Sequence, residues 1–132
     1  MMTNRFMALF KLFIFIIIAG QLTGCVAIVA GGAAGAGAVV YVKGELQEDI
    51  NASATRVHRA TVVALKQLDL PLIENAHDKM SSKIKSRFAD GDDVWIDIEA
   101  VTSESSKITI RVGIMGNENK ARTILSEMHK YL

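Results

Sequence analysis

Cys25 is the only cysteine among the 132 residues, so few reactions are open to its thiol. A single cysteine cannot form an intramolecular disulfide, and it cannot build a structural zinc site of the multi-thiolate kind. The thiol must therefore have another use. The residues before Cys25, namely Leu22, Thr23 and Gly24, are one aliphatic residue followed by two small ones.

The segment in front of this cysteine has the parts of a secretion signal. Arg5 and Lys11 supply positive charge, and residues 12–19 form an uncharged apolar run. The run fits the roughly 7 to 15 residues of a signal-peptide core, whereas a spanning helix needs about 20. Behind this leader, Leu22-Thr23-Gly24-Cys25 resembles the bacterial lipobox, whose cysteine receives a diacylglyceryl thioether. An ordinary buried cysteine behind an uncleaved anchor is the weaker interpretation.

The lipobox resemblance implies a precursor that is processed before Cys25, which leaves 108 residues with lipid on the cysteine. Two or three acyl chains, at about 0.8 kcal/mol for each buried methylene, hold such a chain durably to one leaflet. In Gram-negative lipoprotein sorting, an aspartate directly after the cysteine favours the inner membrane, and here Val26 occupies that position. We therefore expect a cell-envelope lipoprotein in the outer membrane, facing the periplasm.

Residues 26–42 are uncharged and rich in glycine and alanine. Ala27, Gly31 and Gly35 recur every four residues, and small residues at this spacing let membrane helices approach closely. The 17 residues are the lower limit for a span, and each glycine lowers helix propensity by about 1 kcal/mol. We predict a signal peptide (1–24), a lipid anchor and tether (25–40) and a periplasmic domain (41–132). A membrane-inserting, self-associating segment is the alternative for the tether.

The balance of basic and acidic residues limits which classes of partner the chain can bind. Residues 1–24 contain two basic residues and no acidic ones, which leaves 13 basic and 14 acidic residues in the rest of the chain. This balance argues against nucleic acid as a partner.

One strand-like segment is locally basic and could contact anionic lipid headgroups or envelope phosphates. The competing interpretation is a solvated face that pairs across strands with Asp97 and Glu99. The basic residues are Lys79, Lys83, Lys85 and Arg87.

Apolar periodicity predicts the secondary structure of the domain. A helix capped by Asn51 or Ser53 ends before Pro71, and a second helix follows a cap at Asn117. Strands are predicted at residues 40–47, with a possible bulge at Gly44, and at 72–76, 81–88, 94–98 and 108–114. The order β-α-β-β-β-β-α indicates an α+β two-layer sandwich with a largely antiparallel sheet.

Alternation within the last two strands separates core from surface. Ile96, Ile98, Ile110 and Val112 are predicted to face the core, in a row that continues to Ile114. Asp97 and Thr109 face the other way, and Trp95 shares their outward register. The pattern leaves open whether Trp95 is an exposed contact or is covered by a chain terminus.

Catalytic patterns are missing from the sequence. It has no G-x-S-x-G and no H-E-x-x-H. His129, in a final helical turn, is better explained by the helix dipole than as a base. His77 and Asp78 are adjacent and fit a solvated turn better than a metal site, while His58 lies on a helix surface. We therefore expect no catalytic residue, metal or cofactor; a hydrolase with an unrecognised site is the alternative.

Several segments together resemble a family of small bacterial lipoproteins that is known only as a domain of unknown function. They are the lipobox cysteine, the alanine-glycine run, Tyr41-Val42-Lys43-Gly44-Glu45-Leu46, the strand at 93–100, and 108–116 followed by Asn117-Glu118. The resemblance covers nearly the whole mature chain and implies no activity, ligand or catalytic residue. We expect a non-enzymatic binding or structural module whose partner is an envelope protein or polymer.

Overall fold

The computed structural model describes residues 7–9, 11 and 38–132. The chain divides into two units, Met1–Gly35 and Ala36–Leu132. In the first unit, residues 7–9 and 11 are helical. Within the described residues, no helix is both long enough and apolar enough to cross a membrane. Apart from residues 7–9 and 11, the predicted signal peptide lies outside the described residues, as do the lipobox, Cys25 and nearly all of the predicted tether.

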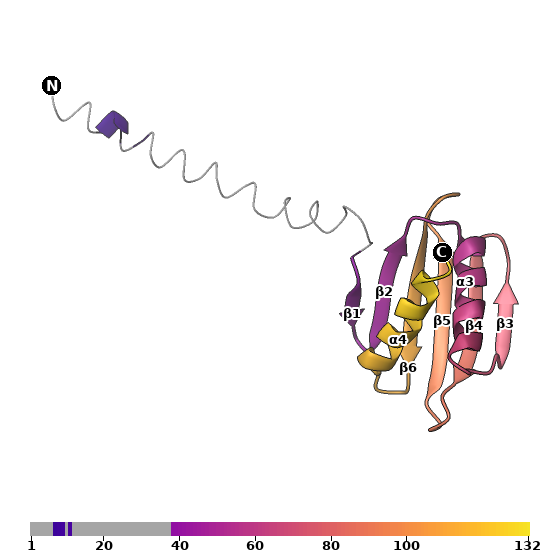
Figure 1. Cartoon of the computed structure of the whole chain (residues 1–132). Coiled ribbons are helices and arrows are strands. Elements are labelled where there is room, and N and C mark those ends of the chain that lie inside the picture. Colours follow the sequence, from indigo (N-terminus) through magenta and orange to yellow (C-terminus); the bar gives the residue numbers. More distant parts are fainter. Residues whose placement is uncertain (1–6, 10, 12–37) are drawn as a thin grey trace. The chain divides into compact units, whose positions relative to one another are not determined.

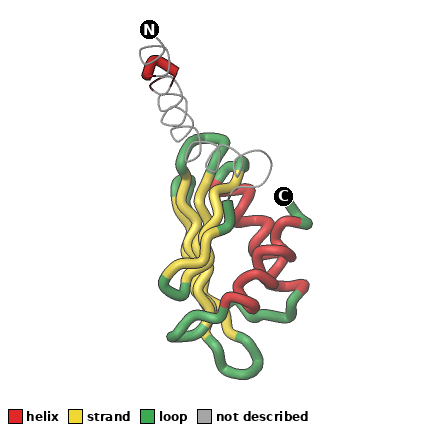
Figure 2. The backbone as a smooth tube through the Cα atoms, turned by 90° about the vertical axis from the view of Figure 1, so that its left-hand side faces the viewer, coloured by secondary structure: helices red, strands yellow, loops and turns green. Residues whose placement is uncertain are grey.

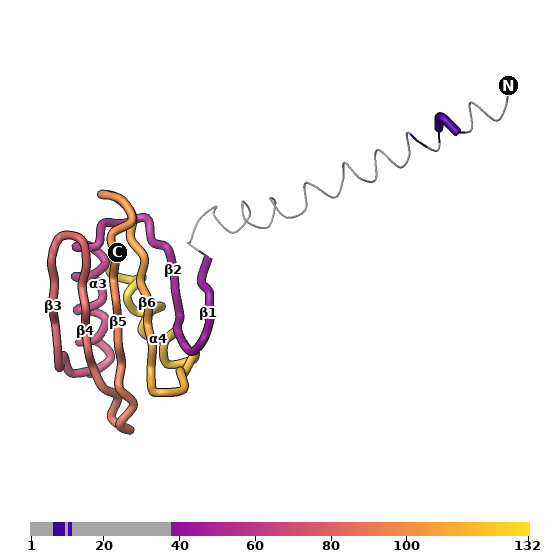
Figure 3. The backbone as a smooth tube through the Cα atoms, turned by 180° about the vertical axis from the view of Figure 1, so that it is seen from behind, coloured from indigo at the N-terminus to yellow at the C-terminus, as the bar shows by residue number. Residues whose placement is uncertain are grey.

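The second unit is a six-stranded antiparallel sheet with two helices on one face (Figure 1). The strand order is β1-β2-β6-β5-β4-β3. Figure 2 shows the helices and the sheet as two layers, and Figure 3 shows the opposite face of the sheet, in front of the helices. The predicted α+β class is confirmed. The elements are β1 Val40–Val42, β2 Glu45–Ile50, α3 Ala54–Gln67, β3 Glu74–His77, β4 Ser81–Arg87, β5 Asp93–Ala100, β6 Ser106–Val112 and α4 Glu118–His129.

The first predicted strand is a hairpin of two strands. Lys43 and Gly44 have φ values of 53° and 84°, and they form the two-residue turn between β1 and β2. Two successive positive φ angles match the twist of the flanking strands, and glycine reaches them without steric strain. The predicted bulge at Gly44 is therefore wrong, and the observed order gains one strand, becoming β-β-α-β-β-β-β-α.

The core lies between the sheet and the two helices. Alternate residues of β5 and β6 face the helices, and the four predicted core positions on these strands are at most 1% exposed. Outward neighbours such as Asp97 and Thr109 are only half-buried. Both helices contribute one buried apolar stripe, as their periodicity predicts. The stripes contain Val57, Ala60, Ala64 and Leu65 of α3 and Ala121, Ile124, Leu125 and Met128 of α4.

Side-chain caps begin both helices where the sequence predicts them. The Ser53 hydroxyl accepts a hydrogen bond from the Arg56 N–H at 3.4 Å, so Ser53 rather than Asn51 caps α3. The Asn117 carbonyl oxygen accepts one from the Lys120 N–H at 3.1 Å and caps α4. Each bond satisfies a backbone donor that the first helical turn leaves without a partner.

Strand β6 is shorter than predicted. It ends at Val112, because Gly113 takes a φ of 71° and turns the chain away from the sheet. The expected continuation of the core row to Ile114 is therefore wrong, and the Ile114 side chain is 82% exposed. The remaining segment, residues 113–117, connects β6 to α4 and is called the β6–α4 loop here.

Candidate functional site

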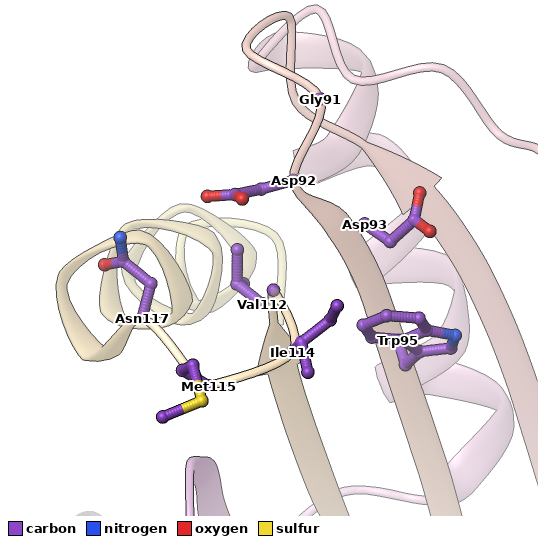
Figure 4. Close-up of a pocket in the computed structure, with 10 residues that line it drawn as sticks. Gly91, Asp92, Asp93, Trp95, Val112, Ile114, Met115 and Asn117 are labelled. Carbon is purple, nitrogen blue, oxygen red and sulfur yellow. The ribbon is translucent and has the colours of Figure 1, made fainter.

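A hollow of about 420 Å³ opens at the end of the sheet where β6 finishes and β5 begins (Figure 4). The turn between β4 and β5 forms one side of it, and the β6–α4 loop forms the other. Its walls combine apolar side chains, one tryptophan and polar groups that can accept hydrogen bonds. The side chains that give the hollow its chemistry are Asp92, Asp93, Trp95, Ile114, Met115 and Asn117.

Two apolar side chains of the β6–α4 loop are exposed to solvent. Ile114 is 82% exposed and Met115 is 90% exposed, which makes them the most exposed large apolar side chains in the part of the chain that the structure describes. Figure 4 shows Ile114 directed toward the Trp95 ring and Met115 directed away from it. Trp95 lies on the face of the sheet opposite the helices, in the outward register that the sequence predicts.

The backbone of the loop is held in place by its neighbours. The Gly113 N–H donates to the Asp93 carbonyl at 2.8 Å, and Arg111 Nη2 donates to the Ile114 carbonyl at 2.6 Å. At Gly116, whose φ is 82°, an added Cβ would come within 2.6 Å of the Gly44 carbonyl oxygen. The β1–β2 turn therefore packs directly on the loop, and only glycine fits at this contact.

Ion pairs fix the acidic side of the hollow. Lys120 Nζ binds the carboxylates of Asp90 and Asp92, the latter at 2.7 Å, and lies 4.8 Å from the Phe88 ring centroid. Hydrogen bonding from Lys120 lowers the pKa of Asp90, and the pKa of Lys120 is raised by the same bond. These contacts tie the β4–β5 turn to the first turn of α4.

Asp93 is paired with a cation of the neighbouring strand β4. Arg87 Nε lies 2.6 Å from Asp93 Oδ1, and this hydrogen bond lowers the pKa of Asp93. The two carboxylates that line the hollow, Asp92 and Asp93, are thus bound by cations that lie outside its lining. The lining itself contains no lysine or arginine, so its polar rim is acidic.

The predicted basic residues are only partly brought together. Lys83, Lys85 and Arg87 lie on the open face of β4, whereas Lys79 lies in the turn between β3 and β4. A cross-strand partner faces each of the three. Lys83 lies opposite Asp97, Lys85 lies between Glu74 and Trp95, and Arg87 pairs with Asp93. Contact with an anionic surface stays a prediction, and these neighbouring acids counter the charge available for it.

The three histidines occupy two separate places. The rings of His58 and His77 stack, with centroids 4.2 Å apart and planes 4° from parallel, across α3 and β3. His129 Nε2 lies 2.6 Å from Glu48 Oε2, and Glu48 is only 2% exposed. His77 is the last residue of β3, and the turn begins at Asp78, whose Oδ1 accepts from the Met80 and Ser81 N–H groups. Among the described residues, no three His, Cys, Asp or Glu side chains are placed to hold a metal ion.

Reasoning from the sequence placed Trp95 correctly on the outward face but missed the two exposed loop residues of the hollow, Ile114 and Met115. Ile114 was expected in the core-facing row of a strand, because the apolar alternation continues past Val112. The available signal is the pair of glycines, Gly113 and Gly116, that brackets the two apolar residues. Glycines at that spacing indicate positive φ angles on either side of a short loop.

The family model described as Protein of unknown function (DUF3568) matches residues 8–131. The chain belongs to this family. Its match spans all of the described domain except Leu132, including the hollow, α3 and α4, and the description assigns no activity to it. No curated protein matches the sequence.

Proposed function

We propose that this DUF3568 protein is an envelope lipoprotein, acylated on Cys25, whose domain is a non-enzymatic binding module. In this proposal the hollow contacts a protein partner. The single observation that carries the binding role is the β6–α4 loop, which presents Ile114 and Met115 to solvent from a backbone that its neighbours hold in place. The leader and the residues Leu22-Thr23-Gly24-Cys25 support the anchor.

Exposed apolar side chains on a held loop favour association. Burial of apolar surface against a partner is favourable at about 25 cal/mol for each Å² removed from water. A loop whose conformation is already set loses little further entropy on binding, so more of this gain appears as affinity. Tryptophan and methionine are also enriched in the cores of protein interfaces, and Trp95 and Met115 both line the hollow.

Charge favours a protein over a membrane as the occupant. The hollow is lined by Asp92 and Asp93 and by no basic side chain. With Asp90, three carboxylates stand here against the two cations Lys120 and Arg87, which leaves one negative charge in excess. Anionic headgroups attract basic segments, so an acidic rim is a poor match for such a surface. The complementary partner is a protein with an apolar depression flanked by lysine or arginine. The 13 residue-to-residue steps from Cys25 to Ala38 span at most about 45 Å, so this partner must lie within that reach of the membrane, allowing for the size of the domain.

The anchor is tested by replacing the acylated sulfur. Cys25→Ser in the full chain is expected to abolish incorporation of labelled palmitate and to leave the precursor uncleaved at this position. Ser105→Ala, a change far from the leader in sequence, serves as the processing control. Unchanged palmitate labelling in Cys25→Ser would contradict the proposed anchor.

The contact surface is tested by crosslinking within the native membrane. A photoreactive amino acid at Met115 is expected to give one discrete protein adduct, while the same probe at Val101, which is 61% exposed, gives none. Ile114→Ser should weaken the adduct from position 115. Mass spectrometry should place the crosslink on an apolar surface with neighbouring basic residues. Adducts only to lipid, or equal adducts from both positions, would reject the hollow as a protein contact.

A further inference from the structure

Strand β3 forms one edge of the sheet. It pairs with β4 on one side, in the register Glu74 with Lys85 through His77 with Ser82, and no described strand pairs with its other side. All four residues of β3 are exposed. An edge strand with a free row of backbone groups can accept a further strand.

The hydrogen-bond pattern shows which backbone groups point outward. The Asp78 N–H donates to the Ser81 carbonyl at 2.9 Å, so Asp78 and Ser81 form a hydrogen-bonded pair. Hydrogen-bonded and non-hydrogen-bonded pairs alternate along antiparallel strands. Alternation therefore directs the N–H and C=O groups of Glu74 and Ala76 toward β4, and those of Asn75 and His77 toward the open edge.

A groove of about 450 Å³ runs between this edge strand and α3. The side chains of Asn75 and His77 form its strand side, and one stripe of α3 forms its helix side. The His58–His77 stack and a 2.7 Å contact between His58 Nε2 and Asn75 Oδ1 join the helix to the strand. These contacts set the width of the groove independently of any ligand.

The groove has an apolar floor and a basic rim. Val62 and Val63 are half-buried on the helix side, and the exposed Arg59 and Lys66 lie on either side of them along α3. No aspartate or glutamate lines the groove. Within the described part of the chain, neither Arg59 nor Lys66 has a carboxylate within ion-pair distance, in contrast to the basic residues around the hollow.

We propose that the groove between α3 and β3 binds an acidic, extended peptide segment of another protein, which adds to the sheet as a strand antiparallel to β3. Strand addition combines main-chain hydrogen bonds to an open edge with side-chain recognition in an adjoining groove. Here Asn75 and His77 supply the edge, the two valines supply the apolar contact, and the rim supplies charge complementarity. This site is separate from the hollow and does not depend on it.

The spacing of the rim defines the peptide. Arg59 and Lys66 are seven residues apart, which is about 10.5 Å along a helix axis. Every second residue of the added strand faces the groove, and two such steps cover about 13 to 14 Å. The long, flexible side chains of Arg59 and Lys66 bridge the difference between the rim spacing and the length of the peptide strand. The expected peptide has five residues in the pattern acidic–any–aliphatic–any–acidic. Its aliphatic side chain packs on Val62 and Val63.

The test uses the peptide Gly-Glu-Thr-Val-Thr-Glu-Gly with a fluorescent label and the full-length protein in detergent micelles. Fluorescence anisotropy should show saturable binding that weakens as salt is raised. Arg59→Glu combined with Lys66→Glu should weaken binding at least about tenfold, since two attractions become repulsions. Arg56→Glu combined with Lys79→Glu makes the same change in charge at exposed residues outside the groove, and should change affinity less than about twofold. Absence of saturable binding, or equal weakening by both pairs, would overturn the proposal.

Backbone methylation of the peptide distinguishes strand addition from charge attraction alone. Residues opposite each other in antiparallel strands share a face, so the valine of the peptide faces the groove and directs its N–H toward β3. N-methylation of this valine should therefore abolish most of the binding, and N-methylation of a neighbouring threonine should leave it nearly unchanged. Amide NMR shifts should be largest at Asn75 and His77. Equal effects of the two methylations would reject an added strand.

Discussion

The two faces of the sheet use alternate residues of the same strands in different ways. On the helix-covered face, Ile96, Ile98 and Ile110 are essentially inaccessible to solvent. On the open face, residues of opposite charge follow one another across strands. In one row, Glu45 lies opposite Arg111 and Glu74 lies opposite Lys85, with Trp95 between the two pairs; in another, Lys107 lies between Asp49 and Glu99. The free energy of unfolding therefore depends mainly on the helix-covered face. The open face instead balances its charges locally.

The difference matters for the search for function. An open face whose charges pair across strands presents little free charge to a partner, although most of its strand residues are ionisable. The features that remain without a counterpart inside the described domain lie at the margins of the sheet. They are the apolar loop at one end and the basic groove at one edge.

The largest expected effect comes from truncating the covered face. Ile110→Ala removes a fully buried side chain and should lower the free energy of unfolding by about 2 to 5 kcal/mol, because a cavity replaces lost packing. Its neighbour on the open face, Thr109, should tolerate alanine within about 1 kcal/mol. Urea unfolding measures both. Equal losses at the two positions would contradict the distinction between the faces.

Two pairs of polar side chains, one on each face, give a smaller effect. Glu48 faces the covered side and is 2% exposed, and His129→Ala would leave it without its 2.6 Å partner. An unsatisfied buried polar group costs about 1 to 3 kcal/mol. Lys107→Ala removes the exposed pair with Asp49 on the open face, and should cost less than about 1 kcal/mol. A larger loss for Lys107→Ala would reverse the comparison.

The pH dependence of the open face is a finer test. The hydrogen bond from Arg87 lowers the pKa of Asp93, so the stabilisation from this pair is fully present above the ordinary aspartate pKa of about 3.9. It is lost as the pH falls through the lowered folded-state pKa. The melting temperature of Arg87→Gln should therefore lie slightly below that of the parent protein at neutral pH and converge with it in strong acid. A difference that persists at the lowest pH would exclude the ionised Asp93 as its source.

The smallest effect is expected for binding of acidic vesicles to the basic strand. Each lysine or arginine near an anionic membrane contributes about 1 kcal/mol when its charge is free. Asp97, Glu74 and Asp93 lie beside Lys83, Lys85 and Arg87, so we expect flotation of a variant lacking the lipid anchor to differ little between neutral and acidic vesicles. Strong, salt-sensitive flotation that glutamine substitutions remove would restore the basic strand as a lipid contact.

Sequence periodicity predicted most of the domain because its signals are local. The caps at Ser53 and Asn117, the apolar stripes of both helices and the alternation in β5 and β6 each require only neighbouring residues. The hairpin at Lys43 was misread, since an apolar alternation that continues through a two-residue turn looks like one strand. Ile114 was misplaced for the same reason, because alternation alone does not show where a glycine ends the strand.

The sequence by itself determined the α+β class, the faces of its helices and strands, and the expectation of a lipid on Cys25. Tertiary structure alone decided which distant residues meet: Gly44 against Gly116, Asp90 against Lys120, and α3 beside the edge strand β3. Within a regular helix or strand, periodicity predicts which residues face the core, because apolar side chains recur on the covered face. It does not record strand order, and strand order placed the β6–α4 loop beside Trp95 and left β3 at the edge of the sheet.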